Sequence, residues 1–478
     1  MSFTDIGFPI FLVLCLVVLH ACWKLSIRKW VLILFSYVFC LSFGFGSVIV
    51  ITLAAIADFF VGRRLESASN DEFRRRWLWL GLAANLAPLA YFKYSVFAAE
   101  TFSLLMRHFG FRIPVPSVHL VAIIGLSYFT FAGMSYLFDV YYGKIDASQN
   151  ASDYLSYLVY FPKLIAGPIA RAADFLPQIS RGFRITAKDV EIGCIYLLVG
   201  ATKKLVIADQ LAGHVSMIMS TPQRYNGSTL IQGVIGYAIQ IYTDFSGYSD
   251  MAIGCARLMG IQLPQNFMMP YSSINIAEFW RRWHITMSNW FRDYVFLPLE
   301  VNSRGMRNAT ARASINLVIT MLLCGLWHGA SWNFVVWGGI HGIALAIYQT
   351  YADFRGRPSR SQARSPFHPV TCASRALTLS VVLLGYVFFG TRTLSIAWTY
   401  LWRLLTWSRD GIALNSPYIL PLTAIVVIVH FLIGKDRNLI EELADYSIPT
   451  RVLTYTVLLM ALFSLVPSES VPFVYVRF

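Results

Sequence analysis

Charged residues are scarce in this sequence of 478 residues. Asp, Glu, Lys and Arg make up 13% of it, about half of the roughly 25% typical of soluble domains. Hydrophobic residues make up 56%, and the mean hydropathy is +0.57. Because so few charges cannot cover the water-exposed surface of a chain this long, the composition excludes a set of soluble domains. It indicates a polytopic membrane protein embedded in the lipid bilayer.

Several chemical signatures are also missing. The seven cysteines form no Cys-x-x-Cys pair, and most lie in apolar runs, so we expect neither a metal site nor a disulfide framework. The excess of Lys and Arg, 39 against 25 Asp and Glu, is scattered between apolar runs, which argues against a nucleic-acid partner. The chain also lacks the Gly-x-Ser-x-Gly motif of serine hydrolases. No histidine is followed by an aspartate five residues later, as in glycerolipid acyltransferases.

Uncharged runs long enough to cross a bilayer follow one another along the chain. Since one helical crossing needs about 20 apolar residues, we expect roughly eleven transmembrane helices, together with re-entrant or short segments. Two runs, 30–57 and 313–352, are too long for one upright helix. Run 313–352 would measure about 60 Å as a helix, which equals two crossings of a roughly 30 Å core. We therefore expect a helical hairpin that turns near Ala330.

The basic loops predict an orientation. Lys and Arg are concentrated in 24–29, 63–76, 171–188, 292–312 and 355–375, and such loops favour the cytoplasm. This places the N-terminus outside. The first apolar run, 6–23, precedes its positive charges, so we interpret it as a retained span and not as a cleaved signal peptide.

Among nine histidines, His328 has the most unusual setting. It lies in the sequence GLWHGASW, near the middle of the uncharged hairpin, where a polar side chain is costly unless it faces a cavity or a partner. Gly325 and Gly329 flank it and leave the backbone open to a substrate or to another helix. Its apolar surroundings favour the neutral imidazole, which can accept a proton. A histidine that is hydrogen-bonded across a helix contact fits the residues equally well.

A second candidate, His284, follows an aromatic and basic segment. Asn275 and Glu278 resemble an N-cap and its capping-box partner, so a helix should begin there. On that helix Glu278 would pair with Arg282, and Arg281 would lie beside His284. The segment fits an interfacial anchor helix with a snorkelling basic face. The alternative is that His284 faces the same pocket as His328.

Other polar residues in apolar surroundings are weaker candidates. Asp244 follows an apolar run, and pairing with Arg257 or Arg281 is at least as good an explanation as catalysis. His341 lies in the second half of the hairpin, where packing explains it better. His20 and His430, in plain apolar runs, are expected to be satisfied core residues.

Several blocks of sequence resemble a known family. GLWHGASW at 325–332, followed by WGGIHG at 337–342, resembles the signature of the membrane-bound O-acyltransferase family. Four further blocks resemble its bacterial branch, which contains the alginate O-acetyltransferase membrane subunit and the teichoic-acid D-alanyl transfer protein: SYFTFAGMSYLFDV (127–140), YFPKLIAGPIAR (160–171), DFSGYSDMAIG (244–254) and EFWRRWHI (278–285). Residues 299–305 (LEVNSRG) depart from that branch, which usually has a short glycine-pair loop there. We expect a single domain, 1–478, with its signature core at about 113–342.

The resemblance implies an all-α polytopic fold, with the transmembrane helices in a ring around a thin centre. In that family His328 would match the histidine regarded as catalytic, and His284 the second site histidine. His328 would act as general base, while His284 would orient the acyl group or stabilise developing charge. The residues expected to bind substrate are Asp244, Trp327, Arg281 and the signature histidine His341.

The resemblance also implies a function. It implies transfer of acyl groups, with acetyl-CoA as donor and no bound cofactor, across the bacterial inner membrane. A periplasmic esterase-like partner protein would pass the acyl group to an exported polysaccharide such as alginate or cellulose. Two alternatives stay open: a transporter or flippase for acylated or glycan cargo, and an acyltransferase of the same fold that acts on lipid or protein. The first would more often show internal repeats, and the bacterial blocks argue against the second.

Overall fold

The computed structural model describes residues 1–115, 121–303, 305, 308–356, 367–432, 438–467 and 471–473. Throughout these ranges the regular structure is helical, and Tyr225 and Ile412 form an isolated β-bridge. The prediction of an all-α protein is therefore confirmed for the described part of the chain. The chain divides into two compact units, Met1–Leu197 with Ser249–Pro264, and Leu198–Tyr248 with Gln265–Phe478. The central part of the basic loop 355–369 expected from the sequence, residues 357–366, lies outside the described residues.

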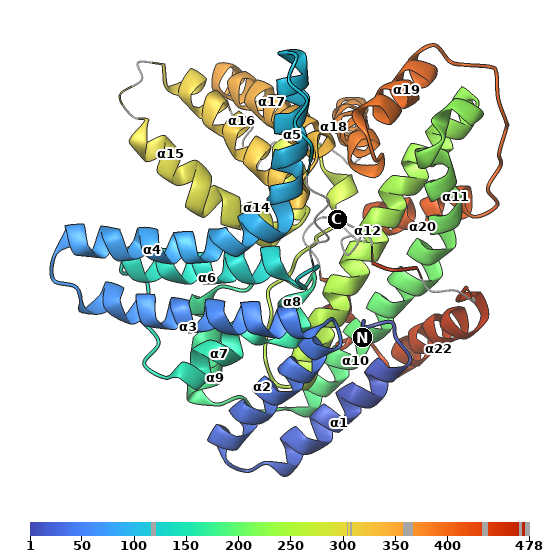
Figure 1. Cartoon of the computed structure of the whole chain (residues 1–478). Helices are drawn as coiled ribbons and strands as arrows, with labels where there is room; N and C mark the ends of the chain where they lie inside the picture. The colour runs from blue at the N-terminus through green and yellow to red at the C-terminus, as the bar shows by residue number, and fades with distance from the viewer. Residues whose placement is uncertain are drawn as a thin grey trace. The chain divides into compact units, whose positions relative to one another are not determined.

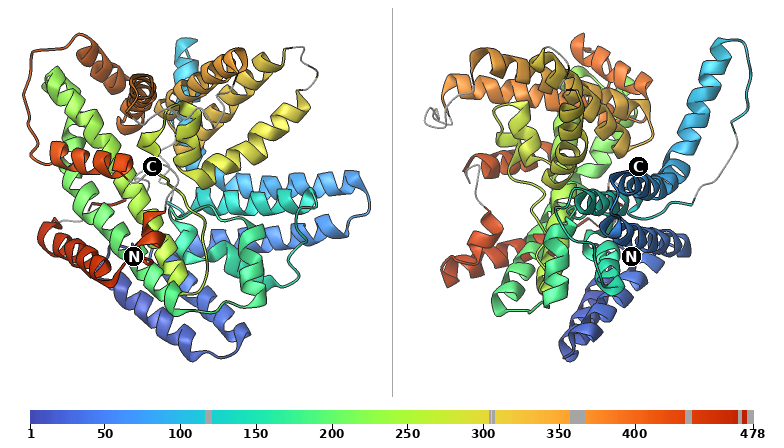
Figure 2. Two further views of the ribbon diagram at one scale, coloured as in Figure 1. Left: turned by 180° about the vertical axis from the view of Figure 1, so that it is seen from behind. Right: turned by 90° about the vertical axis from the view of Figure 1, so that its left-hand side faces the viewer.

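The first unit is built from the N-terminal helices. Helices α3, α4 and α6 pack on one another and lie side by side (Figures 1 and 2). The long run 30–57 is divided between α2 and α3 at Gly44, whose φ of 115° is a left-handed conformation that suits glycine. The helices are α1 (Gly7–Ala21), α2 (Leu25–Leu41), α3 (Phe45–Ser67), α4 (Asp71–Leu89), η1 (Ala90–Tyr94), α5 (Ser95–His108), α6 (Leu126–Tyr141), α7 (Ala151–Val159), α8 (Phe161–Leu164), α9 (Ala172–Arg181) and α10 (Ala187–Ala201).

A buried polar network joins four helices of this unit. The Asp58 carboxylate on α3 accepts hydrogen bonds from Asn85 Nδ2 on α4 at 2.6 Å and from the Tyr154 hydroxyl on α7 at 2.9 Å. Gly133 on α6 lies directly against this carboxylate, and a Cβ added there would overlap Asp58 Oδ2. Because a carboxylate in an apolar interior must find donors, this network fixes how α3, α4, α6 and α7 pack.

The second unit carries the sequence signatures. Its helices are η2 (Thr202–Ala208), α11 (Asp209–Ser220), η3 (Pro222–Arg224), α12 (Gly227–Leu258, which continues into the first unit), η4 (Pro270–Ser272), α13 (Ile276–Arg282), α14 (Ile285–Phe291), η5 (Arg292–Phe296), α15 (Leu297–Asn302), α16 (Ala309–His328), α17 (Trp332–Arg355), α18 (Pro369–Gly390), α19 (Leu394–Leu405), α20 (Ile419–Leu432), α21 (Leu439–Leu443) and α22 (Ile448–Leu465).

The expected hairpin is present in the second unit. Helices α16 and α17 lie side by side (Figure 1) and are joined by the turn 329–331, in which Ser331 caps α17 by accepting from Asn333 N. The backbones approach closely because a Cβ at Gly325 would overlap the Phe334 carbonyl oxygen, and one at Gly338 the Met321 carbonyl oxygen. Small residues at the contact of two apolar helices permit this approach. Gly325 therefore serves the contact between the helices.

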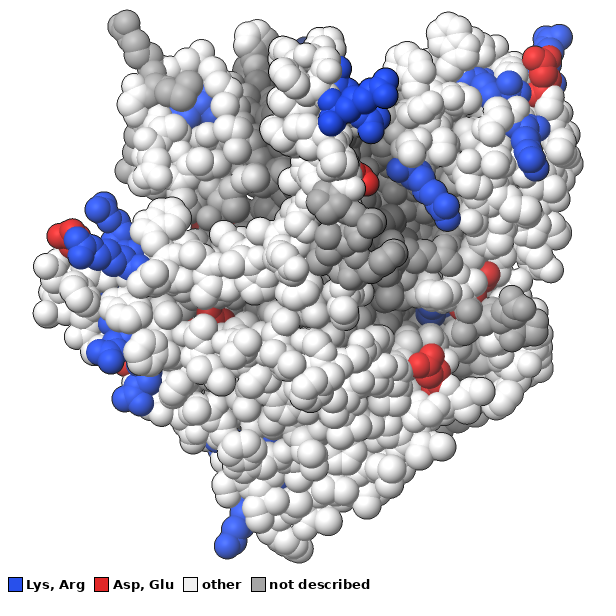
Figure 3. Space-filling view, viewed as in Figure 1, with Lys and Arg blue, Asp and Glu red and all other residues white. Residues whose placement is uncertain are grey.

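The apolar character of several helices fits a membrane. By length and composition, four described helices can cross a bilayer: α3, α16, α18 and α22. Large apolar side chains are exposed on α22, where Phe463 is 87% and Leu453 65% accessible, and wide areas of the face in Figure 3 carry no charge. The number of eleven crossings stays a prediction. Other apolar helices are shorter, such as α1 with 15 residues, or carry charges, such as the first turn of α4.

Candidate functional site

Three histidines of the second unit are buried and linked through two tryptophans. The ring centroids of His284 and Trp327 are 5.8 Å apart, those of Trp327 and His328 5.0 Å, those of His328 and Trp337 4.8 Å, and those of Trp337 and His341 4.9 Å. The histidines are 0%, 3% and 1% accessible in chain order. We call these five residues the histidine row. The structure thus brings together four of the residues that the sequence nominated and adds Trp337.

His328 is the last residue of α16 and lies at the turn of the hairpin. Its ring packs edge-on against Trp337 of α17 and against Phe389 of α18, with centroids 5.2 Å from the latter. The turn is held from α18 as well, because Asn333 Nδ2 donates to the carbonyl oxygens of Phe388 and Thr391. Three helices therefore fix the position of the His328 imidazole.

His284 lies between two short helices, and the sequence expectation for it was wrong in one respect. Helix α13 ends at Arg282, and His284 has a left-handed φ of 44° before α14 begins. Arg281 and His284 are therefore not neighbours on one helix, and Arg281 is exposed at the end of α13. The His284 ring lies edge-on to Phe245 at 4.7 Å and stacks on Phe267 at 6.3 Å. This histidine is in the core of its unit.

One polar contact of His284 could not be found from the sequence. Asn266 Oδ1 lies 3.0 Å from His284 Nδ1, and the same oxygen accepts from Thr286 Oγ1 at 2.9 Å. Asn266 is 1% accessible. It stands 18 residues before His284 in an irregular segment, and nothing in the local pattern marks it. His284 itself belongs to none of the four candidate spans, and burial lowers its pKa to about 3, so its imidazole is neutral at physiological pH.

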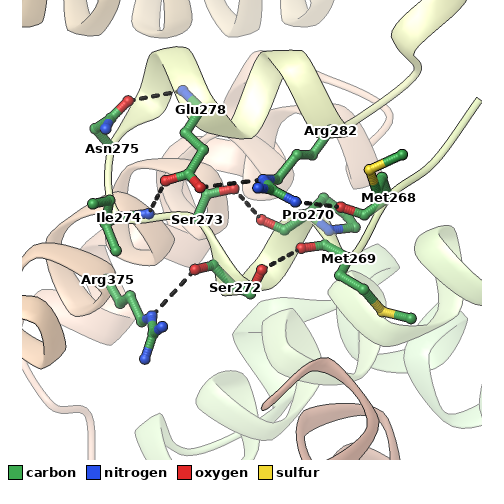
Figure 4. A network of polar contacts seen from close by, with 10 residues as sticks. All are labelled: Met268, Met269, Pro270, Ser272, Ser273, Ile274, Asn275, Glu278, Arg282 and Arg375. Carbon is green, nitrogen blue, oxygen red and sulfur yellow. Dashed lines mark hydrogen bonds and ion pairs between the residues drawn. The ribbon is translucent and has the colours of Figure 1, made fainter. Parts of the chain in front are cut away.

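The helix before His284 begins as predicted. Asn275 caps α13, since its side chain accepts from Glu278 N at 2.8 Å. The carboxylate of Glu278 accepts from Ile274 N instead of completing the capping box at Asn275, and it pairs with Arg282 at 3.2 Å (Figure 4). Arg282 also donates to the Met268 carbonyl oxygen. Because Arg282 is 8% accessible, the expectation of a snorkelling basic face is wrong for this residue.

Asp244 is paired with a residue that the sequence did not suggest. Its carboxylate lies 2.7 Å from Lys204 Nζ, which is also 2.7 Å from Asp209 and 2.8 Å from the Val471 carbonyl oxygen. The predicted partners, Arg257 and Arg281, are wrong. Lys204 lies in the π-helical segment η2, and α12 approaches it at Gly247, where a Cβ would come 3.0 Å from Lys204 N. In the sequence, Lys203 and Lys204 interrupt an apolar run at 192–208, and this interruption is the signal that could have found the cluster.

The remaining histidines are placed more simply. The His341 ring lies edge-on to Trp280 at 5.2 Å and is tilted against Trp337. Its Nε2 faces Gly385, where a Cβ would come 2.7 Å from it. His430 lies in the core as expected, with Nδ1 2.8 Å from the Val426 carbonyl oxygen, but within the described part of the chain its Nε2 has no hydrogen bond. His20 was expected in the core but is exposed, and its Nδ1 contacts the carbonyl oxygen one turn earlier on its own helix.

A helical membrane protein with buried imidazoles gathered at the turn of a glycine-packed hairpin has the means for acid–base chemistry within an apolar interior. Among the described residues, no group of three or more His, Cys, Asp or Glu side chains could hold a metal ion. The family model of the membrane-bound O-acyltransferases (MBOAT) matches residues 126–359. The chain belongs to this family, and it is an O-acyltransferase.

Named relatives support this assignment over most of the chain. The protein named "Probable alginate O-acetylase AlgI" of Pseudomonas aeruginosa is 36% identical over 372 residues, which is 78% of this chain and 68% of that protein. The peptidoglycan O-acetyltransferase of Helicobacter pylori is 32% identical over 371 residues, 72% of this chain and 67% of its own. The teichoic acid D-alanyltransferase of Bacillus subtilis is more distant, at 28% over 246 residues, 49% of this chain and 61% of its own. The histidine row lies within the matched family region.

Proposed function

We propose that this chain transfers acetyl groups across the bacterial inner membrane for the O-acetylation of an exported polysaccharide such as alginate or cellulose. The names of the relatives support a polysaccharide acceptor. Acetyl-CoA is the proposed donor, and a periplasmic esterase-like protein is the proposed partner that passes the group on. The proposal includes the family arrangement of roughly eleven crossings in a ring around a thin centre.

The observation that carries the proposal is the position of His328. It is a buried histidine at the turn of a hairpin in which residues 313–352 include no Asp, Glu, Lys or Arg, and aromatic rings from α17 and α18 hold it in place. A neutral imidazole there would accept the proton of an acceptor hydroxyl while the hydroxyl oxygen bonds to the acetyl carbon. The carbon–sulfur bond of the thioester would then break, and the imidazolium would return its proton to the departing thiolate. Atoms and charge balance without a metal or a redox partner.

Other residues of the row have supporting roles in this proposal. Trp327 and His341 would shape the apolar wall against which the acyl chain lies, since both rings are buried in the row. Asp244, which pairs with Lys204, would help to bind substrate near His284, because the next residue, Phe245, contacts the His284 ring. Arg281, exposed at the end of α13, would meet an anionic part of the donor outside the row.

A direct test follows labelled acetyl groups. Membranes that contain the wild type are supplied with isotopically labelled acetyl-CoA, and the label is counted in the polysaccharide, lipid and protein fractions. We expect label in polysaccharide, and a loss of about 10²- to 10⁴-fold in His328→Gln, because Gln keeps the size and polarity but cannot act as a base. His430→Gln is the matched control, since this buried histidine lies outside the row and is bonded to the Val426 carbonyl oxygen. We expect it to transfer normally.

The outcomes separate the alternatives. Label that accumulates in lipid or protein but never in polysaccharide would replace the proposed acceptor. Passage of unaltered cargo without any acetyl transfer would favour a transporter. Normal acetylation by His328→Gln, at equal protein level in the membrane, would show that His328 is structural and not the base.

A further inference from the structure

The contact between Asn266 and His284 determines which nitrogen of the imidazole carries the proton. Besides His284 Nδ1, the Asn266 side-chain atom Oδ1 faces the Thr286 backbone N at 3.3 Å and Thr286 Oγ1 at 2.9 Å. A backbone N–H can only donate, so the Asn266 atom that faces it must be the amide oxygen, which can only accept. His284 Nδ1 must therefore donate to it. A neutral imidazole has one N–H, and Nε2 consequently carries a lone pair.

The local backbone holds this geometry. Ile285 N donates to the Asn266 carbonyl oxygen at 2.9 Å, so Asn266 is tied to three consecutive residues, from His284 to Thr286. The left-handed φ of 44° at His284 lets the chain turn within this clamp. Residues other than glycine rarely adopt this conformation, and they keep it where the surrounding structure determines it. The clamp therefore gives a physical reason for the conformation of His284.

Two polar atoms of the pair point away from the contact. Within the part of the chain that the structure describes, His284 Nε2 and Asn266 Nδ2 are buried and have no hydrogen-bond partner. Buried polar atoms are usually satisfied, and an exception at a family-specific site calls for an explanation such as a bound group. An acceptor nitrogen that is prepared in this way fits a ligand that donates a hydrogen bond.

We propose that Asn266 is a positioning residue that holds His284 as the Nδ1–H tautomer, so that Nε2 accepts a hydrogen bond from the acceptor molecule, at a hydroxyl other than the one that gives its proton to His328. This inference rests on the proposed function and deepens it. The sequence left two roles open for His284, orienting the acyl group or stabilising developing charge, and this inference assigns it orientation of the acceptor instead. The neutral Nε2 cannot donate to a developing oxyanion, whereas it can hold the acceptor molecule so that its reacting hydroxyl is aligned for attack.

The charged groups around His284 are paired with one another. On α12, Asp244 next to Phe245 pairs with Lys204, and on α13, Arg282 pairs with Glu278. The elements that contact the ring contribute Phe245, Phe267, Trp327 and Asn266, and His328 follows Trp327 on α16. The carboxylate that Asn266→Asp introduces would therefore be a charged group in direct contact with His284 Nδ1.

The test compares two substitutions of Asn266 with a neighbouring control. Asn266→Leu removes the acceptor, and we expect acetyl transfer to fall on the order of 10²-fold, the lower end of what a positioned acid–base group contributes. Asn266→Asp keeps an acceptor for Nδ1–H and for both Thr286 donors, so we expect it to retain transfer within about tenfold at pH 8. Ser288→Ala removes a side-chain bond to the Trp283 carbonyl oxygen and leaves the clamp intact, so it should stay within about twofold of the wild type.

A pH series separates positioning from simple packing. The carboxylate of Asn266→Asp should raise the pKa of His284 by about 1–3 units, so the ratio of its rate to the wild-type rate should fall toward acid pH. The ratio for Asn266→Leu should be constant. All rates are divided by the amount of monodisperse protein extracted, so that poor accumulation does not imitate a loss of catalysis. Wild-type rates in Asn266→Leu, equal losses in both variants at pH 8, or a constant ratio for Asn266→Asp would each overturn the assignment.

A second measurement does not depend on activity. In protein with ¹⁵N-labelled histidine, the His284 signals are assigned by their absence in His284→Gln, and magnetic resonance should show a protonated Nδ1 and an unprotonated Nε2. The Nδ1–H signal should be lost in Asn266→Leu. A protonated Nε2 in the wild type would refute the tautomer. If the tautomer is found but the wild type transfers no acetyl group, the proposed function fails and the positioning of His284 stands.

Discussion

Lys204 is a buried charged residue that pairs with two buried carboxylates. Its ammonium group is 2.7 Å from both Asp209 and Asp244, and all three side chains are at most 2% accessible. The cluster holds one positive and two negative formal charges. Lys204→Met removes the cation that pairs with both carboxylates, whereas Asp244→Asn leaves the Lys204–Asp209 pair intact.

The expected free-energy changes follow from this count. Breaking a buried pair by removing one partner costs about 3–5 kcal/mol, because it leaves an uncompensated charge. We expect a loss of at least this size for Lys204→Met. The loss for Asp244→Asn should be smaller, about 1–3 kcal/mol, the cost of a weakened buried hydrogen bond. At about 2 °C per kcal/mol for a unit of this size, Lys204→Met should lower Tm by about 6 °C or more.

These shifts in Tm are measured by heating the protein in detergent and determining the fraction that remains monodisperse. Lys203→Met is the matched control, because Lys203 belongs to the same segment η2 but is half-buried. We expect it to change Tm by no more than about 2 °C. If Lys204→Met were as stable as Asp244→Asn, the two carboxylates would not need the ammonium group. The reasoning from buried charge would then be refuted.

Three further predictions test other parts of the molecule. Cysteines placed at Ser26 and Gly356, in a background without native cysteines, should be blocked by membrane-permeant thiol reagents alone; labelling of both by an impermeant reagent from outside would contradict the predicted orientation. Gly133→Ala should destabilise the first unit by about 1–3 kcal/mol, because the new methyl group overlaps Asp58 Oδ2, while Gly213→Ala, which meets open space, should extract at the wild-type level. His341→Gln should retain measurable acetyl transfer, and complete loss would assign His341 to the chemistry.

Local and length-dependent features could be predicted from the sequence. The hairpin was found because an uncharged run of that length must fold back within a bilayer, and its turn at 329–331 lies where the run is divided in half. The cap of α13 was found because Asn275 and Glu278 lie three residues apart, a spacing set by helix geometry. Both inferences depend on neighbours in the sequence.

Features that depend on distant partners could not be predicted. Asp244 pairs with Lys204 across two helices, and the choice among several basic residues is made by the close approach at Gly247. The helical pattern of the segment before His284 does not show that the chain leaves the helix at Trp283. Asn266 has no motif of its own, since its role arises when an irregular segment folds against α14. The sequence therefore identified the histidines but not what orients them.

The polar groups of the second unit differ in how they are satisfied, and this difference bears on function. Lys204 and Arg282 are paired with buried carboxylates. Among the described residues, both ring nitrogens of His341 and the Nε2 atoms of His284 and His430 are buried without a hydrogen bond. Each such atom costs about 1–3 kcal/mol, which an apolar ring of similar size would avoid. Packing alone therefore does not explain these imidazoles. For His284 and His341, which lie in the histidine row, the proposed function supplies a reason, because an incoming reactant would provide the missing hydrogen bonds.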